Sequence, residues 1–523
     1  MLFILFLTIN GMAFSQVPSA FFVDRNAYDA YPILGTHLKS TPNLKKMPAI
    51  PNVQWLLAED KELAGYGDFP FRFGYEFDVN YSLGDGTWEE TENERIWRLS
   101  VSSQGAYSLN FIFSELNLKS DAKIYIFNPD GSMVYGPVTE RQNIPQDGQF
   151  FLTDLIAGDH VVIQLHEPKT ANDTSKLTIS KVVHAYVNMF PTEVITKAAK
   201  YNCHNDVACY PEWATEAKSV ALILLSSGSY WCTGALVNNT RQDKRPFFLS
   251  AFHCIDTDSD PYNLSEAEIN NAQNWAFRFH YQKTTCNGSA VYNYVTYNYA
   301  YFRAAWGPTD FLLMELQNLN NAEENNIAFA GWDRRASVPS SGTGIHHPAG
   351  DLMKISFDYN NLVSNSTSIS WTDNTTSPVN THWKVGYDNG TTEGGSSGSP
   401  LFNQNHRIVG QLHGGGSGCP PVSKWYGRFD KSWTGGGTNE TRLSNWLDPM
   451  SSNVTYLDGM DPGCTVETIQ NKTFSNNTTI NGCNIDVQNV TVKNGAKLTL
   501  DAEKEITING PFEVETGAEL EIK

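Results

Sequence analysis

The sequence predicts a mainly β protein of several domains, and three observations support this expectation. The chain has 523 residues, which at about 150 residues per domain favours about three domains. Hydrophobic residues make up 40% of the chain and charged residues 18%, with 28 Phe, 23 Tyr and 13 Trp, so there is enough apolar surface for folded cores. The apolar residues come in short runs rich in aromatic and β-branched side chains, separated by turn residues, which is typical of strands.

The net charge excludes some classes of partner. The chain carries 37 Lys and Arg against 56 Asp and Glu, which gives a formal charge of −19. This charge repels phosphate backbones and anionic lipid, so we expect no nucleic-acid binding. Beyond the first residues, no apolar run approaches the roughly 20 residues that a membrane-spanning helix needs. We therefore expect a soluble protein with no membrane span.

Residues 1–15 have the features of a secretory signal peptide. They carry no charge, are mostly apolar, and end in Ala13-Phe14-Ser15, with small side chains where a signal peptidase reads them. We expect cleavage before Gln16 and a secreted protein, extracellular or at the cell surface. A short buried segment is the alternative interpretation.

The cysteines indicate a disulfide framework. There are eight, at positions 203, 209, 232, 254, 286, 419, 464 and 483, and no C-x-x-C spacing that would favour a zinc ribbon. Secretion permits disulfides. Because all eight follow residue 202, we expect a disulfide-free N-terminal unit, a stapled middle and a last pair that serves the C-terminus.

Residues 16–197 predict a β-rich N-terminal domain. The part up to about residue 90 reads as irregular. Short strands then alternate with turn signals, which favours a β-sandwich. The expected strands are Ile96–Val101, Tyr107–Phe113, Lys123–Phe127, Phe150–Leu152 and Val161–Leu165. A polar, lysine-bearing stretch around Lys197 and Lys200 reads as a linker.

Two further domains follow the linker. Residues 198–460 are dense in short strand-like runs with little helical periodicity, which predicts a mostly β, barrel-type domain. Residues 461–523 alternate polar and apolar residues, and two similar segments start at Gly495 and Gly517, 22 residues apart. This pattern predicts a small module of stacked strands whose open end is available for contact with a cell surface.

Three segments of the middle domain carry catalytic residue types. An apolar strand, Phe247–Ala251, leads into His253 and Cys254. Asp310 precedes another apolar strand, and Ser397 lies in the glycine-rich turn Gly394–Pro400. Alone, each has an ordinary structural explanation as a strand-end or turn residue. The three together are more specific.

Serine acyl transfer requires these residue types. A base must take the hydroxyl proton, a carboxylate must orient the base, and backbone N–H groups must face the developing oxyanion. Glycine before the serine allows its amide to turn inward without a Cβ clash. The order His253, Asp310, Ser397 is the order of chymotrypsin, and it differs from that of subtilisins and α/β-hydrolases.

From about Ala198 to about Pro449 the chain resembles the bacterial lysyl endopeptidase branch of the chymotrypsin-like (trypsin-like) serine proteases. Besides the three segments, the matching motifs are Cys232–Thr240, Ala330–Arg335, Ile345–Pro348, Gly410–Gly415, Tyr426–Arg428 and Arg442–Pro449. The resemblance implies a double β-barrel and a secreted serine endopeptidase that hydrolyses polypeptides through an acyl-enzyme. It implies no cofactor.

The resemblance also implies residue roles. His253 is the general base, Asp310 its orienting carboxylate and Ser397 the nucleophile, with the N–H groups of Gly395 and Ser397 as the oxyanion hole. Further implied residues are an aromatic–histidine stack of Trp371 on His413, a pocket residue Gly414, and the disulfides Cys203–Cys419, Cys209–Cys286 and Cys232–Cys254. Cys464–Cys483 falls outside the family pattern.

The chain departs from the family in the specificity pocket. Lysine selectivity needs an acidic residue two positions before Tyr426, and this position is Lys424. A buried ammonium facing a substrate lysine is costly, so we expect altered P1 specificity. If Lys424 points into the pocket, an acidic or neutral P1 residue fits better; if it points to solvent, the pocket is uncharged. Glu393 is a second pocket candidate that would favour basic side chains.

Maturation also has to differ from that of chymotrypsin. The residue before the nucleophile is Ser396 rather than aspartate, so a new N-terminus has no carboxylate to pair with there. We expect a zymogen in which the N-terminal domain is a propeptide that assists folding or blocks the cleft, until the linker is cut near Lys197 or Lys200.

Other classes of function remain as alternatives. A catalytically inactive homologue that acts as a secreted or surface binding protein would not require all of these residues, and an adhesin rests on the flanking β domains alone. His346 and His347 lack H-E-x-x-H spacing, so we expect no metal. We expect a monomer whose partners are polypeptide substrates.

Overall fold

The computed structural model describes residues 16–22, 40–66, 69–144, 148–169, 174–190, 202–257, 263–317, 319, 322, 326–372, 375–416, 418–419, 422–463 and 466–523. The predicted signal segment, Lys197, Lys200 and Cys464 lie outside these residues. By internal contacts the chain forms two units, Met1–Asn320 with Phe329–Met460, and Asn321–Ala328 with Asp461–Lys523. Among the described residues, no helix has the length and apolar character to cross a membrane.

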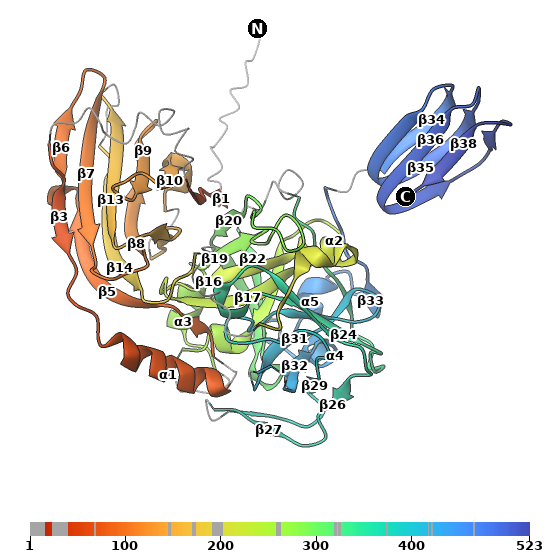
Figure 1. Ribbon diagram of the computed structural model, residues 1–523. Helices are drawn as coiled ribbons and strands as arrows, with labels where there is room; N and C mark the ends of the chain where they lie inside the picture. Colours follow the sequence, from red (N-terminus) through yellow and green to blue (C-terminus); the bar gives the residue numbers. More distant parts are fainter. Residues whose placement is uncertain are drawn as a thin grey trace, which may run out of the picture. The chain divides into compact units, whose positions relative to one another are not determined.

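The N-terminal part of the first unit is a β-sandwich (Figure 1). One sheet contains β2 (Ala20–Phe22), β10 (Met133–Val138), β9 (Lys123–Phe127), β13 (His160–Pro168), β7 (Glu94–Ser102), β3 (Asn43–Lys46) and β6 (Thr87–Glu90). The other contains β11 (Phe151–Leu152), β8 (Ser108–Asn117), β14 (Lys176–Ala185), β5 (Gly74–Ser82) and β12 (Ile156–Ala157). All five predicted strands are present.

Strand β8 shows how the sandwich is built. Leu109, Phe111 and Phe113 alternate along it and point into the core between the two sheets. The opposite face carries Asn110, which donates to the carbonyl of Gly228 at 3.1 Å, and Ile112, which packs in a core shared with the middle of the chain. The strand is therefore buried on both faces, because its second face rests on the next domain.

The expectation that residues 16–90 are irregular is wrong. Helix α1 (Val53–Tyr66) and the nine-residue strand β5 lie there. In β5, tyrosine, phenylalanine and valine alternate with polar residues at every second position, and Val79 and Tyr81 pack on the sandwich core. In α1, Leu56 is buried while Trp55 is 59% exposed, so apolar residues do not mark one face of the helix.

The middle of the chain forms two curled sheets, as the double-barrel expectation requires. The first contains β1 (Gln16–Val17), β20 (Val295–Asn298), β19 (Ala276–Phe279), β16 (Val220–Leu224), β17 (Tyr230–Val237), β18 (Phe247–Ala251), β22 (Phe311–Leu316), β21 (Ala300–Trp306) and β4 (Phe71–Arg72). Strands β1 and β4 come from the predicted N-terminal domain, so that domain contributes strands to the barrel sheet.

The second sheet contains β15 (Asn205–Asp206), β25 (Lys354–Asp358), β24 (Gly342–His346), β30 (Pro400–Phe402), β31 (Arg407–Gly415), β32 (Lys424–Arg428), β29 (His382–Val385), β26 (Val363–Ser364), β23 (Gly331–Asp333) and β33 (Tyr456–Leu457). A separate hairpin is formed by β27 (Ile369–Ser370) and β28 (Thr376–Ser377). The short helices are α2 (Ala214–Ala217), α3 (Glu266–Ala272), α4 (Phe429–Thr434) and α5 (Ser444–Leu447). One apolar core joins the two sheets, with Phe247 and Leu313 from the first and Ile355 and Phe402 from the second.

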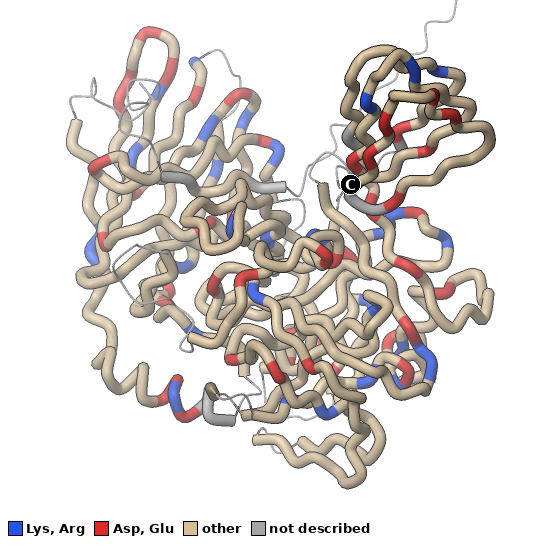
Figure 2. The backbone as a smooth tube through the Cα atoms, turned by 45° about the vertical axis from the view of Figure 1, so that its right-hand side comes forward, with Lys and Arg blue, Asp and Glu red and all other residues tan. Residues whose placement is uncertain are grey.

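The C-terminal unit is a stack of parallel strands: β34 (Val466–Phe474), β35 (Thr478–Val492), β36 (Lys497–Ile508), β37 (Phe512–Val514) and β38 (Glu519–Ile522). The pairing aligns Lys497 with Glu519 and Leu500 with Ile522, which is the 22-residue offset read from the sequence. Its core includes Ile485, Val487, Leu498 and Leu500. Figure 2 shows Lys and Arg scattered among Asp and Glu along the described parts of the chain.

Candidate active site

His253 is held at the end of a buried strand. All five residues of β18 are buried, and the chain then makes a single 3-10 turn over Phe252–Cys254. Cys254 forms a disulfide with Cys232 of β17, with 6.6 Å between the Cα atoms. The histidine is therefore fixed on one side by its strand and on the other by a covalent link.

Asp310 meets His253 because their strands pair. Strand β18 runs antiparallel to β22, with Ala251 opposite Phe311. Asp310 adopts a left-handed conformation, φ 57° and ψ 27°, just before β22, and its carboxylate turns back toward the histidine. Oδ1 accepts from the backbone N–H of His253 at 2.9 Å, and the ring Nδ1 lies 3.1 Å from Oδ1 and 3.0 Å from Oδ2. This contact fixes the proton on Nδ1 and the lone pair of the neutral ring on Nε2.

The turn that carries Ser397 is anchored on β17. Thr233 donates from its N–H to the carbonyl of Ser397 at 2.8 Å and from its hydroxyl to the carbonyl of Gly395 at 2.7 Å. Gly398 has φ +81°, and a Cβ there would lie 2.7 Å from the nitrogen of Ala251. Glycine is required at this close approach, which brings the Ser397 turn against the strand that ends at His253.

Some backbone N–H groups of this turn donate hydrogen bonds within the protein and others do not. Ser396 donates to Glu393, Gly398 to Leu412 and Ser399 to Ser396, at 2.8–3.0 Å. Within the described residues, the amides of Gly395 and Ser397 donate to no acceptor. These are the two predicted oxyanion-hole donors, and Gly395 reaches its conformation at φ +88°.

A stacked aromatic pair lies beside His253. The ring centroids of Trp371 and His413 are 3.5 Å apart at an interplanar angle of 21°, as the resemblance implies. The ring of His413 is also stacked at 5.7 Å on that of His253, and its Nδ1 lies 3.9 Å from Oδ2 of Asp310. A further buried residue, His382, contacts His413 at 3.0 Å between Nε2 and Nδ1. No local pattern in the sequence marks His382, because the pairing of β29 with β32 brings it here.

His253, Asp310 and His413 each carry an atom of a type that can bind a metal ion, and these three atoms lie within 4.8 Å of one another. Two of the histidine nitrogens already have protein partners, since Nδ1 of His253 bonds Asp310 and Nδ1 of His413 contacts His382.

Lys424 points into the protein, so the solvent-facing alternative is wrong. The residue is 1% exposed, and its Nζ donates to the carbonyls of Thr392, at 2.9 Å, and Gly416. Burial lowers its pKa to about 7, while the nearby Glu393 acts in the opposite direction. On the neighbouring strand, Gly415 lies opposite Lys424 and Gly414 opposite Trp425.

Glu393 does not present a free carboxylate to a substrate. Its Oε1 lies 2.8 Å from Nε2 of His204, and both side chains are less than 10% exposed. His204 follows Cys203, which forms a disulfide with Cys419. The remaining predicted disulfide within the described residues, Cys209–Cys286, is also formed.

A neutral buried network lies where chymotrypsin-like zymogens form their activation ion pair, which the sequence predicts to be absent here. The Ser396 hydroxyl lies 2.8 Å from Nδ1 of His346, whose Nε2 lies 3.2 Å from the hydroxyl of Ser356. Burial holds the pKa of His346 well below its ordinary value. The turn before Ser397 is thus supported without a carboxylate at position 396.

A cavity of about 390 Å³ opens beside His253; Phe69, Pro70, Tyr230, Asp256 and Glu268 are among its lining residues. Phe69 and Pro70 lead into β4, which pairs antiparallel with β17, Phe71 opposite Trp231 and Arg72 opposite Tyr230. A Cβ placed on Gly394 would lie 3.7 Å from the Cβ of Phe71 and 3.9 Å from the carbonyl oxygen of Phe69. The 69–72 segment of the N-terminal part therefore lies close to the turn that carries Ser397 and lines the cavity beside His253.

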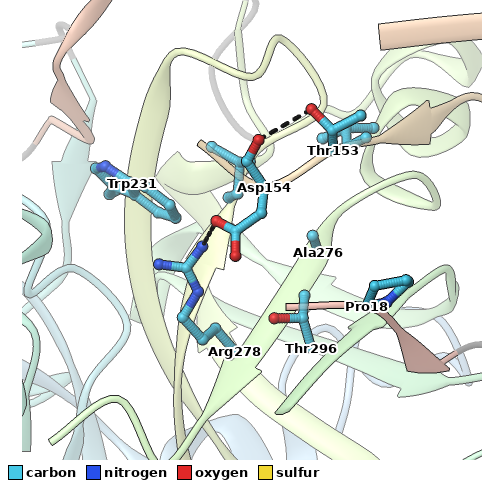
Figure 3. Close-up of a pocket in the computed structure, with 9 residues that line it drawn as sticks. Pro18, Thr153, Asp154, Trp231, Ala276, Arg278 and Thr296 are labelled. Atoms are coloured by element: carbon cyan, nitrogen blue, oxygen red, sulfur yellow. Dashed lines mark hydrogen bonds and ion pairs between the residues drawn. The ribbon is translucent and has the colours of Figure 1, made fainter. Parts of the chain in front are cut away.

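A buried ion pair also joins the N-terminal part to the barrel. Figure 3 shows Asp154, from the sandwich, and Arg278, from β19, facing each other beside Trp231. Both residues are 8% exposed. Asp154 also accepts from the hydroxyl of Tyr294 at 2.7 Å and from the N–H of Ala20 at 3.0 Å. The carboxylate is therefore saturated with donors.

Comparison with known proteins gives matches over the same region. Residues 198–427 match the family described as lysyl endopeptidase, C-terminal domain. A lysyl endopeptidase from Pseudomonas aeruginosa is 30% identical over 294 residues, which cover 51% of this chain and 58% of that protein. Secreted RxLR effector protein 73 from Plasmopara viticola is 24% identical over 347 residues, 62% of this chain and 78% of that protein.

Solved structures of proteases also align. A Glu endopeptidase aligns at 15% identity and a TM-score of 0.29 over 44% of this chain and 93% of its own. The active form of the Rv3671c protease from M. tuberculosis aligns at 15% identity and a TM-score of 0.27 over 46% and 88%. Residues 198–427, which include His253, Asp310 and Ser397, are therefore similar in sequence to the lysyl endopeptidase family.

Proposed function

We propose that this chain is the precursor of a secreted serine endopeptidase. Ser397 attacks the carbonyl carbon of the scissile peptide bond, and Nε2 of His253 takes the hydroxyl proton. Asp310 holds the ring and stabilises the imidazolium, and the amides of Gly395 and Ser397 stabilise the oxyanion. His253 returns the proton to the leaving amine. Water then hydrolyses the acyl-enzyme by the same base.

The observation that carries this proposal is the contact between His253 and Asp310. Two donors of one histidine, its backbone N–H and its Nδ1, converge on a carboxylate that is 1% exposed. A turn residue with only a structural role would not need a buried charge beside an imidazole. Independent support comes from the backbone N–H groups of Gly395 and Ser397, which donate to no acceptor within the described residues.

Turnover of a quenched fluorescent peptide mixture tests the proposal. Ser397→Ala is expected to lose at least about 1,000-fold in kcat, since the nucleophile is removed, and to unfold at the same temperature as the parent. Ser340→Ala, on the exposed surface, is the matched control and keeps full activity. Equal turnover by Ser397→Ala and the parent would refute the assignment.

We further propose that the P1 preference is altered from lysine. The buried amine of Lys424 supports this, because it offers a substrate lysine no carboxylate and, when protonated, a second cation; Glu393 is already paired with His204. Acidic or neutral P1 residues fit this charge better.

A peptide library cleaved by the mature enzyme measures this preference. Lys424→Asp restores the acidic residue of the family and is expected to raise cleavage after lysine at least about 10-fold relative to other residues. Dominant cleavage after lysine by the unchanged enzyme would contradict the proposal.

The N-terminal part acts as a propeptide in this proposal. Two contacts support it: the 69–72 segment pairs with β17 beside the cavity at His253, and the sandwich shares an apolar core with the barrel. An extended substrate that needs the same strand edge is excluded while β4 occupies it. N-terminal sequencing of secreted protein with full activity is expected to find a start near residue 198. Full activity with an intact start at Gln16 would overturn the propeptide role.

A further inference from the structure

A buried chain of polar groups leads from Nδ1 of His413 through His382 and Thr381 to the carbonyl of Pro378. His382 is 0% exposed, and its Nε2 is 3.0 Å from Nδ1 of His413. Its Nδ1 is 2.9 Å from the hydroxyl oxygen of Thr381. That hydroxyl lies 2.6 Å from the carbonyl oxygen of Pro378. None of these three residues carries a role in the mechanism above.

The direction of each hydrogen bond follows from the groups themselves. The carbonyl of Pro378 only accepts, so the single hydroxyl proton of Thr381 is donated to it. The Thr381 oxygen must then accept the Nδ1–H of His382. In a neutral imidazole the other nitrogen is an acceptor, so Nε2 of His382 accepts the Nδ1–H of His413.

Burial keeps both rings neutral. It lowers the pKa of His382 to about 3 and holds that of His413 well below its ordinary value, with His382 and His253 acting in the same direction on His413. The chain of donors therefore keeps one orientation throughout the pH range in which a histidine base works.

We propose that His382 is a positioning residue that fixes the tautomer of His413 and turns its Nδ1 proton away from Asp310. Nδ1 of His413 is only 3.9 Å from Oδ2 of Asp310. Without an acceptor at His382, the His413 ring can turn so that this N–H donates to the carboxylate. It then competes with His253 for Asp310. The inference rests on the proposed function, because it concerns the strength of His253 as the base.

Competition between His413 and His253 for Asp310 is expected to weaken His253 as a base. A carboxylate that shares its charge with a second donor stabilises the imidazolium of His253 less, so the pKa of His253 falls and the base becomes weaker. The acid limb of kcat/KM then moves to lower pH while kcat falls. The titratable groups that face His253 are Asp310, His413 and, around the adjoining cavity, Asp256, Glu268 and Tyr230. All of these are left unchanged by substitutions at positions 381 and 382.

Two matched pairs of variants test the inference in the full chain after maturation, with active sites counted by a fluorophosphonate. His382→Phe keeps a ring but removes the acceptor, whereas the amide oxygen of His382→Gln can take the place of Nε2. Thr381→Val removes the acceptor for Nδ1 of His382 at equal volume, whereas Thr381→Ser retains it.

For His382→Phe, we expect kcat per active site to fall about 10-fold, a fraction of the about 100- to 10,000-fold that a general base supplies, with KM within about threefold. The acid limb is expected to move down by about one pH unit. His382→Gln restores both values. Thr381→Val shows the same changes more weakly than His382→Phe, and Thr381→Ser shows neither change. A purely structural role would lower the number of active sites and leave the limb in place.

Unchanged kcat and acid limb in both His382→Phe and Thr381→Val would overturn the inference. If His382→Phe does not fold, the comparison of Thr381→Val with Thr381→Ser decides alone. Absence of Ser397-dependent turnover in the unchanged protein would instead remove the proposed function, and this inference with it.

Discussion

At the scale of single residues, Lys424 shows that the environment of a side chain can differ from the one its residue type predicts. A lysine is ordinarily found at the surface, yet this one is 1% exposed and donates to two backbone carbonyls. The sequence left both orientations open, because an inward and an outward lysine have the same one-dimensional pattern. Only the packing of β32 against the turn before Ser397 distinguishes them.

The buried amine predicts a pH-dependent stability. Burial lowers its pKa from 10.5 to about 7, so between these values the unfolded chain binds a proton that the folded chain does not. Stability from this group therefore rises with pH across that window, and the cost of the buried charge is fully present below pH 7. Lys424→Met is expected to gain stability over the parent most at pH 6 and least at pH 10, measured by denaturant unfolding.

The exposed residue Lys384, on β29, provides the control for this measurement. Lys384→Met removes an amine without burial and is expected to change stability equally at all three of pH 6, 8 and 10. A difference between Lys424→Met and the parent that does not depend on pH would contradict the account of Lys424.

At the scale of elements, strand β17 organises the site. It pairs with β18, carries Cys232 of the disulfide to Cys254, and anchors the serine turn through Thr233. Its outer end pairs with β4 of the N-terminal part. One strand therefore connects the histidine, the serine and the 69–72 segment that lines the neighbouring cavity.

Breaking the pairing of β4 is expected to open the site in the precursor. Phe71→Pro removes a backbone donor and is disfavoured inside a strand pair, whereas Phe71→Tyr retains both the donor and the aromatic ring. The uncleaved Phe71→Pro chain should react with a fluorophosphonate at least about 5-fold faster than the parent, corresponding to about 1 kcal/mol. Equal rates in the parent, Phe71→Pro and Phe71→Tyr would show that the 69–72 segment does not restrict access.

The disulfide beside His253 is expected to contribute measurable stability. It closes a sequence separation of 22 residues, for which loss of loop-closure entropy corresponds to about 3 kcal/mol. A double variant, Cys232→Ala with Cys254→Ala, should lower the free energy of unfolding of the barrel by about this amount. The parent with its disulfides intact is the reference, and a loss below about 1 kcal/mol would contradict the prediction.

At the scale of the whole first unit, the sandwich and the barrel are joined by a common core and by the ion pair of Asp154 with Arg278. Arg278 also lies over the rings of Trp231 and Tyr294, at 5.4 and 4.6 Å from their centroids. Removal of one partner of a buried pair leaves an uncompensated charge, which costs about 3–5 kcal/mol. Separating the N-terminal part from the barrel therefore costs free energy, because it leaves these buried charges without their partners.

Asp154→Ala should therefore loosen the N-terminal part from the barrel in the full chain. We expect earlier cleavage of the sandwich by an added protease and a loss of about 3–5 kcal/mol in unfolding free energy. Asp159→Ala, at an exposed position of the same domain, is the control. The double variant Asp154→Ala with Arg278→Leu should recover most of the loss, and failure to recover would show that the ion pair is not its cause.

The sequence predicts those parts of this molecule whose signals are local. The strands before His253 and after Asp310 and the five sandwich strands each follow from patterns of fewer than about ten residues, and the 22-residue repeat follows from two similar short segments. The partners His382, His204 and Thr233 could not be predicted, because contacts between distant strands bring them to the site. Helix α1 and strand β5 were missed since one lacks an apolar face and the other lies among residues that read as irregular.

The most direct test of the central claim is the location of a fluorophosphonate adduct on the matured protein by mass spectrometry. The account predicts a single phosphonylated residue, Ser397, with labelling abolished in Ser397→Ala and strongly slowed in His253→Ala. An unmodified Ser397 in folded, matured protein, or an adduct that persists in Ser397→Ala, would contradict it.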